Sequence, residues 1–222
     1  FYFKEIKKLF GKKVIVKNYS DGITYEKLLQ EYCGKKIGFN GKSNSVNMLK
    51  CMKGFFKGKK VKWYDVSSEL DASREIKTTD EIKNISKACK ETKTVLKKVI
   101  SKLKTGMTEL DVESMFNNEF KKDGFDTAFC IVAFGKNSLS LHHSPGKTKL
   151  KEGPILFDVG AKYKGYCADV SESIWFGKKN TKLKEDYLRE LNFVKNKLEI
   201  VKNQLKPGVK ASKLWDVCKM NM

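Results

Sequence analysis

Two aspartates stand inside the most strand-like segment of the sequence, PILFDVGAKYKGYCADVSESIWFG at residues 154–177. Runs of β-branched and aromatic residues flank a short polar turn that ends in glycine, a pattern typical of a β-hairpin. If Tyr163 and Lys164 form a two-residue loop, Asp158 lies directly opposite Asp169. Facing like charges destabilise an antiparallel pair, so we expect a positive group between these two carboxylates.

A divalent cation is one such group, because carboxylate oxygens are the preferred ligands of hard divalent ions, and a pair of ions fits the geometry better. Ile155, Leu156 and Phe157 precede Asp158 and favour burial of the aspartates. The alternative is an exposed hairpin whose aspartates face water or pair with lysines. The residues alone therefore support a metal site as a hypothesis.

The chain contains two histidines, His142 and His143, in a loop between the strand pattern FDTAFCIVAFG and the hairpin. Histidine is a frequent general acid or base and metal ligand, but it is equally common on surface loops. From the residues alone, a surface position is the favoured interpretation for both.

The elements that must position these residues fall into two domains, which we place at residues 1–70 and 71–222. The first alternates short strand and helix patterns, the rhythm of a small α/β domain, with strands at 14–17, 36–40 and 61–66 and helices at 24–32 and 43–56. The polar stretch at 69–77 marks the boundary.

The second domain begins with two capping boxes, Thr78 with Glu81 and Thr108 with Asp111, each followed by apolar residues at helical spacing. A last long helix is expected at 183–205. The segment 99–112 resembles 199–217, since both contain a helix end, a glycine turn and a new helix, which suggests two related halves.

The net charge of +20 is the strongest compositional signal and suggests attraction to nucleic acid or another anionic partner. Arginine occurs only at positions 74 and 189, and the lysines are spread over every segment, so a nucleic-acid partner is not favoured. Six dispersed cysteines predict reduced thiols. With no membrane-spanning or signal-peptide pattern, we expect a cytoplasmic protein.

Four ordered segments together resemble the Xaa-Pro dipeptidase and Xaa-Pro aminopeptidase family of pita-bread metallopeptidases: REIKTTDEI at 74–82, LKTGMTELDV at 103–112, VAFGKNSLSLHHSPG at 132–146 and FDVGAKYKGYCADVS at 157–171. The resemblance implies an α/β (α+β) fold in which a creatinase-like amino-terminal domain precedes a pita-bread domain. It also implies a peptidase with two divalent ions, most often manganese or cobalt and sometimes zinc or iron, and a tendency to form homodimers.

By this resemblance Asp158 chelates one ion and Asp169 bridges both, and His142 contacts the substrate. His143, which could exchange roles with His142, and Ser171 are expected to bind substrate or to support the site. The sequence departs from the family at Glu172, which stands where an arginine is usual.

The family's metal-binding histidine and two glutamates have no counterpart before Met222, so this chain supplies two of five expected ligands. We therefore expect a truncated or split pita-bread domain, inactive alone, from an enzyme that hydrolyses Xaa-Pro peptides. The alternative is a non-catalytic, peptidase-like binding module with an acidic or nucleic-acid partner. Methionine aminopeptidase and creatinase are sister possibilities; the amino-terminal domain disfavours the former.

Overall fold

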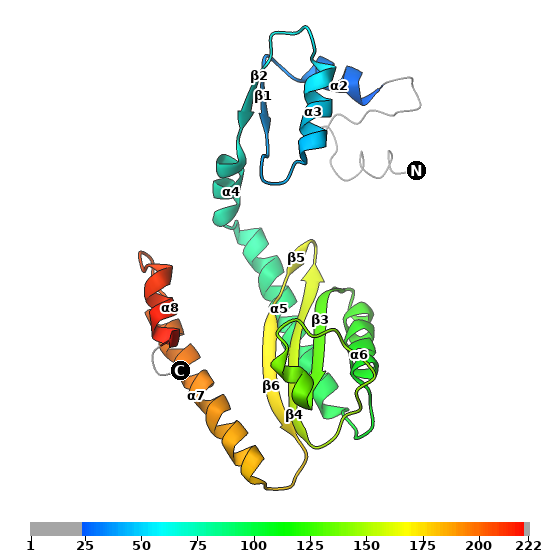
Figure 1. Cartoon of the computed structure of the whole chain (residues 1–222), viewed down its shortest axis with the longest axis vertical. Coiled ribbons are helices and arrows are strands. Elements are labelled where there is room, and N and C mark those ends of the chain that lie inside the picture. The colour runs from blue at the N-terminus through cyan, green and yellow to red at the C-terminus, as the bar shows by residue number, and fades with distance from the viewer. Residues whose placement is uncertain (1–23, 220–222) are drawn as a thin grey trace. The chain divides into compact units, whose positions relative to one another are not determined.

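The structure is a computed structural model that describes residues 24–219. The chain divides into two compact units, residues 1–77 and 78–222, and each is described by itself (Figure 1). Both combine helices and strands, which confirms the mixed fold class expected from the sequence. The predicted strand at 14–17 lies outside the described residues.

The first unit is built on two parallel strands, β1 (Lys36–Phe39) and β2 (Lys62–Asp65), with Ile37 opposite Trp63. Parallel strands require a crossover connection, and a helix supplies it here. The helices of the unit are α2 (Tyr25–Tyr32), α3 (Val46–Phe55) and α4 (Ser67–Glu75). Helix α4 occupies most of the polar stretch in which we expected the domain boundary.

Two helices open the second unit, α5 (Thr79–Ser101) and α6 (Glu109–Lys122). Both begin at the predicted capping boxes, in which the threonine side chain and the acidic side chain three residues later each accept a backbone N–H. The prediction of their start positions from local sequence is confirmed.

An antiparallel sheet packs against these helices. Its strands are β3 (Asp126–Phe134), β4 (Gly153–Tyr163), β5 (Tyr166–Cys167) and β6 (Val170–Phe176). The long β4 lies in the middle, pairing with β3 along one edge and with β5 and β6 along the other. The short 3-10 helix η3 (Gly135–Leu139) follows β3.

The core of this unit lies between the helices and one face of the sheet. Every second residue of β4 is buried there, because successive side chains of a strand point to opposite faces. Phe116 of α6 is fully buried, with its ring centroid 5.6 Å from that of Phe157 of β4. The core residues are Val95, Leu96, Val99, Val112, Phe116, Phe120, Phe125, Val132, Phe134, Leu150, Ile155, Phe157, Val159 and Ala161.

A buried carboxylate ties α5 to α6. Glu119 is 4% exposed and forms ion pairs with three lysines, Lys98, Lys102 and Lys122. Hydrogen bonds from Lys98 and then Lys102 lower the pKa of Glu119 to about 2. The carboxylate therefore remains charged well below neutral pH.

Two further helices follow the sheet, α7 (Lys182–Gln204) and α8 (Ala211–Lys219). Tyr187 of α7 contacts β6 through a 2.7 Å hydrogen bond between its hydroxyl and that of Ser173. Several apolar side chains of α7 are exposed, among them Leu183, Val194 and Leu198. Among the helices formed by residues 24–219, none is long and apolar enough to span a lipid bilayer.

Candidate metal and peptide site

The hairpin exists, but its turn lies one residue later than the sequence suggested. Lys164 and Gly165 are the central residues, with φ of 49° and 87°. Two consecutive positive φ values are typical of a type I′ turn, which glycine adopts without strain. Lys162 therefore pairs with Cys167, and Asp158 pairs with Ser171. The expectation that Asp158 faces Asp169 directly is wrong.

The one-residue shift of the turn nevertheless keeps both aspartates on one face of the sheet. The register of β4 with β6 ends at the pair Val159 and Val170, and continued by one residue it sets Asp169 opposite Gly160, two residues along β4 from Asp158. Antiparallel partners share a face and so do residues two apart, so on this continued register we infer that the aspartates are diagonal neighbours. This face is opposite to the one that packs on α5 and α6.

The aspartates are less buried than the sequence suggested. Asp158 is half-buried and Asp169 is exposed. Burial was inferred from the preceding apolar run, but in that run only Ile155 and Phe157 point into the core, and Leu156 shares the open face with Asp158. The strand period of two, not the run of apolar residues, decides where the carboxylates lie.

Gly160 allows the chain to pass close to β4 beside Asp169. A Cβ atom at position 160 would lie 2.0 Å from the carbonyl oxygen of Ala168 and 2.9 Å from Cε1 of Phe129. Ala168 also donates its N–H to the carbonyl of Ala161 at 2.8 Å. Residues 168 and 169 lie between β5 and β6, outside both strands, so glycine here shapes the backbone that carries Asp169.

Ser171 lies beside Asp158, where the resemblance suggested a supporting residue. Its hydroxyl donates to Oδ1 of Asp158 at 2.7 Å. This bond occupies Oδ1 and not Oδ2 of Asp158, and it restricts rotation of the carboxylate. Within residues 24–219, no group of three or more histidine, cysteine, aspartate or glutamate side chains is arranged to hold a metal ion.

The structure distinguishes the two histidines. His142 is exposed, whereas His143 is half-buried and its Nε2 lies 2.8 Å from Oε2 of Glu109. The sequence left open which of them serves which role. The exposed ring is the one free to meet a substrate, and the adjacent ring is tied to the protein.

Glu109 was not among the residues predicted to matter. It is fully buried at the start of α6 and receives four hydrogen bonds, from the backbone N–H groups of Phe134 and Gly146 and from the side chains of Asn137 and His143. Burial raises its pKa, but these hydrogen bonds outweigh burial and the pKa lies below its usual value. Glu109 lies at helical spacing from Val112, Phe116 and Phe120. An acidic residue on that apolar stripe was the sequence signal that could have indicated a buried carboxylate.

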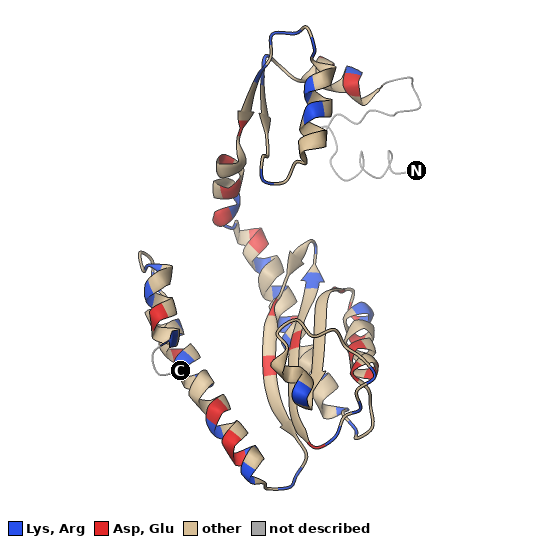
Figure 2. Ribbon diagram, viewed as in Figure 1, with Lys and Arg blue, Asp and Glu red and all other residues tan. Residues whose placement is uncertain are grey.

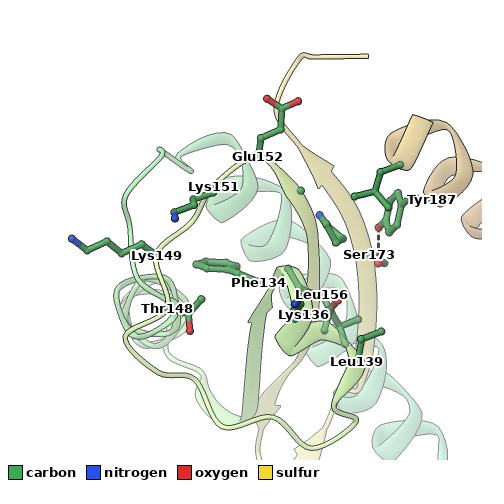
Figure 3. A pocket seen from close by; sticks show the side chains of 15 residues that line it. Phe134, Lys136, Leu139, Thr148, Lys149, Lys151, Glu152, Leu156, Ser173 and Tyr187 are labelled. Carbon is green, nitrogen blue, oxygen red and sulfur yellow. Dashed lines mark hydrogen bonds between the residues drawn. The ribbon is translucent and has the colours of Figure 1, made fainter. Parts of the chain in front are cut away.

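A pocket of about 1090 Å³ adjoins the open face (Figure 3). Leu156, Ser173 and Tyr187 line it, with Phe134 at the end of β3 and Leu139 at the end of η3. Leu156 lies on the same face as Asp158, two residues away along β4, but neither aspartate lines the pocket. Neither histidine lines it.

The chain belongs to metallopeptidase family M24, whose model matches residues 83–221. An uncharacterized peptidase of Staphylococcus saprophyticus is 32% identical over 161 residues, which cover 70% of this chain and 44% of that protein. One of Staphylococcus epidermidis is 37% identical over 154 residues, covering 66% of this chain and 42% of that protein.

Solved structures share the fold. A prolidase of Pyrococcus horikoshii superposes with a TM-score of 0.80 at 24% identity, covering 96% of this chain and 61% of that one. An X-Pro aminopeptidase of Thermotoga maritima superposes with a TM-score of 0.77 at 23% identity, covering 93% of this chain and 57% of that one. Of the two staphylococcal peptidases, the chain spans less than half the length.

Proposed function

We propose that the chain is part of a peptidase that uses two divalent metal ions to hydrolyse the Xaa-Pro bond of dipeptides or of peptide amino termini. The observation that carries the proposal is the pair Asp158 and Asp169 on the open face of the hairpin, with Ser171 hydrogen-bonded to Asp158. Membership of family M24 supports peptide hydrolysis. The prolidase and X-Pro aminopeptidase with the same fold support the proline specificity.

Each residue has a role in this proposal. Asp158 and Asp169 would hold the ions, manganese or cobalt before zinc or iron, since their oxygens suit hard divalent cations. Bound ions of this kind supply a nucleophile by lowering the pKa of water and polarise the peptide carbonyl. Ser171 orients the carboxylate of Asp158, and the exposed His142 contacts the peptide.

The proposal also covers the activity of the chain alone, its oligomeric state and its location in the cell. Two carboxylates are too few ligands for tight metal binding, so the chain alone is inactive and needs ligands from elsewhere. A homodimer is part of the proposal. A cytoplasmic location is also part of it and is supported by six free cysteines.

Manganese binding tests the site directly. Manganous ion at about 1 mM, a concentration suited to a weak oxygen site, should broaden the amide resonances around positions 158, 169 and 171 before others. Asp158→Asn should abolish this local broadening. Asp186→Asn is the matched control, because Asp186 pairs with Lys182 and Arg189 on α7, and it should leave the broadening unchanged. Equal broadening in the wild type and Asp158→Asn would refute the metal site.

Peptide hydrolysis tests the second part. With manganese or cobalt added, the isolated chain should not release proline from an Xaa-Pro dipeptide. A longer product of the same gene that supplies one histidine and two glutamates should do so. Turnover by the isolated chain, lost in Asp158→Asn, would show that the expected inactivity is wrong while supporting the metal site.

The alternative function is a binding module for an acidic or nucleic-acid partner, which the net charge of +20 favours. Figure 2 shows basic residues on helices of both units, intermixed with acidic ones on most of these helices, and so argues for a dispersed charge. Retention on DNA that falls steeply with salt, together with no manganese broadening at the hairpin, would favour this alternative.

A further inference from the structure

The loop between β3 and β4 is fastened at two points by a single carboxylate. Before the histidines, Glu109 accepts the N–H of Phe134 and the side-chain amide of Asn137, both at 2.8 Å. After His142, it meets Nε2 of His143 at 2.8 Å and accepts the N–H of Gly146 at 3.0 Å. Glu109 therefore holds both ends of the intervening segment, residues 138–142, which we call the arch.

The arch has little packing of its own. Leu139 is 86% exposed and Leu141 is 82% exposed, and His142 is exposed as well. Large apolar side chains in water give a loop no cohesive core. Local bonds at its start, such as Ser140 N–H to the carbonyl of Asn137 at 3.0 Å, fix only the first turn. The position of His142 thus depends on the anchors at either end, where Glu109 makes four bonds beside those from Asn137 to Thr148 and from the Leu110 N–H to the Gly146 carbonyl.

The bond to His143 also fixes an imidazole ring. An ionised carboxylate only accepts hydrogen bonds, so Nε2 of His143 must carry the proton directed at Glu109. The side chain of His143 is 19% exposed and that of Glu109 is fully buried, which limits competition from water. The ring of His143 is therefore held in one orientation, with a proton on Nε2.

We propose that Glu109 is a positioning residue, which anchors the ring of His143 and both ends of the arch so that His142 is presented to the peptide. The contact of His142 with substrate rests on the function proposed above. The anchoring itself does not, since it involves neither metal nor peptide. Glu109 acts through the loop and touches no reacting atom.

The ring proton of His143 is the first measurement. Because the chain has only two histidines, the variant His142→Asn assigns both ring signals in ¹⁵N-resolved spectra. We expect a slowly exchanging Hε2 proton on His143 and none on His142. Glu109→Met, which removes both acceptor oxygens at similar volume, should abolish the protected signal. If Glu109 held only the backbone, the wild type would show no protected Hε2 proton, which would overturn the proposal.

Hydrogen exchange of the Gly146 amide is the second measurement. A hydrogen bond to a charged group is worth about 1.5–3 kcal/mol, or roughly 10- to 100-fold in exchange rate, and Glu109→Met should accelerate exchange by that order. If Glu109→Met does not fold, two variants of the neighbouring histidines test the same anchoring. His143→Asn should accelerate Gly146 exchange, by less than loss of the Gly146 bond itself, because Oε2 of Glu109 is then no longer held by the ring, and His142→Asn should leave the exchange unchanged.

Equal Gly146 exchange in the two histidine variants would overturn the proposal, because the ring would then add nothing to the anchoring. These readouts are taken without metal and without peptide. A protein that binds no manganese but shows the protected His143 proton would contradict the proposed function and retain the anchoring. A protein that binds manganese but shows no protected His143 proton would retain the proposed function and contradict the anchoring.

Discussion

Replacement of Gly160 by alanine tests the hairpin geometry on which the carboxylate pair depends. The added Cβ would lie 2.0 Å from the carbonyl oxygen of Ala168, whereas a close carbon-to-oxygen contact is about 3.3 Å. The chain at 168 must therefore retreat by roughly 1.3 Å. Such overpacking costs about 1–3 kcal/mol, and weakening of the neighbouring bond from Ala168 to Ala161 adds about 1 kcal/mol.

We expect Gly160→Ala to lower the free energy of unfolding by about 2–4 kcal/mol in urea denaturation, the sum of these effects. Gly165→Ala is the matched control in the same hairpin. Nothing lies within 4 Å of a Cβ at position 165, but its φ of 87° is left-handed. An alanine there costs about 1–2 kcal/mol of backbone strain without displacing residue 168.

The two variants should also differ at the proposed site. Gly160→Ala should shift the amide resonance of Asp169 and weaken manganese broadening, and Gly165→Ala should do so much less. If Gly160→Ala were as stable as the wild type, or less destabilised than Gly165→Ala, the close passage of residue 168 over β4 would be wrong. The diagonal placement of the aspartates would then need revision.

Three further predictions concern the core, the electrostatics and the carboxylate. Phe116→Ala should cost about 3–5 kcal/mol of unfolding free energy, because it empties a fully buried site against Phe157; a loss below 1 kcal/mol in urea would contradict the packing. The pKa of Glu119 is lowered to about 2, so its stabilisation is complete above its usual pKa near 4.5 and is lost as the pH falls from about 4.5 to about 2. The difference in urea midpoint between the wild type and Glu119→Gln should therefore shrink across that range, and a constant difference would argue against the ion-pair cluster. Ser171→Ala should leave the fold intact but reduce manganese broadening at Asp158, which Ser171 hydrogen-bonds; unchanged metal titrations would show that the hydroxyl does not orient the carboxylate.

Local sequence alone determined where the main helices of the second unit begin. A threonine followed three residues later by an acid satisfies the first backbone N–H groups from within one turn, so Thr78 and Thr108 mark helix starts without reference to the rest of the chain. The expected register set Asp158 directly opposite Asp169, which is wrong, although the observed register continued by one residue keeps the two on one face. The helix starts depend on residues close in sequence, and the structure agrees with them.

Tertiary structure decided the features that depend on distant residues. The turn at Lys164 and Gly165 is itself local, but it lies one residue later than expected, and this changes the partner of Asp158 on the neighbouring strand to Ser171. Glu109 meets donors 25 to 37 residues away, and no local pattern specifies such pairings. A buried carboxylate must find its partners wherever the fold brings them, which is why the role of Glu109 became visible only in three dimensions.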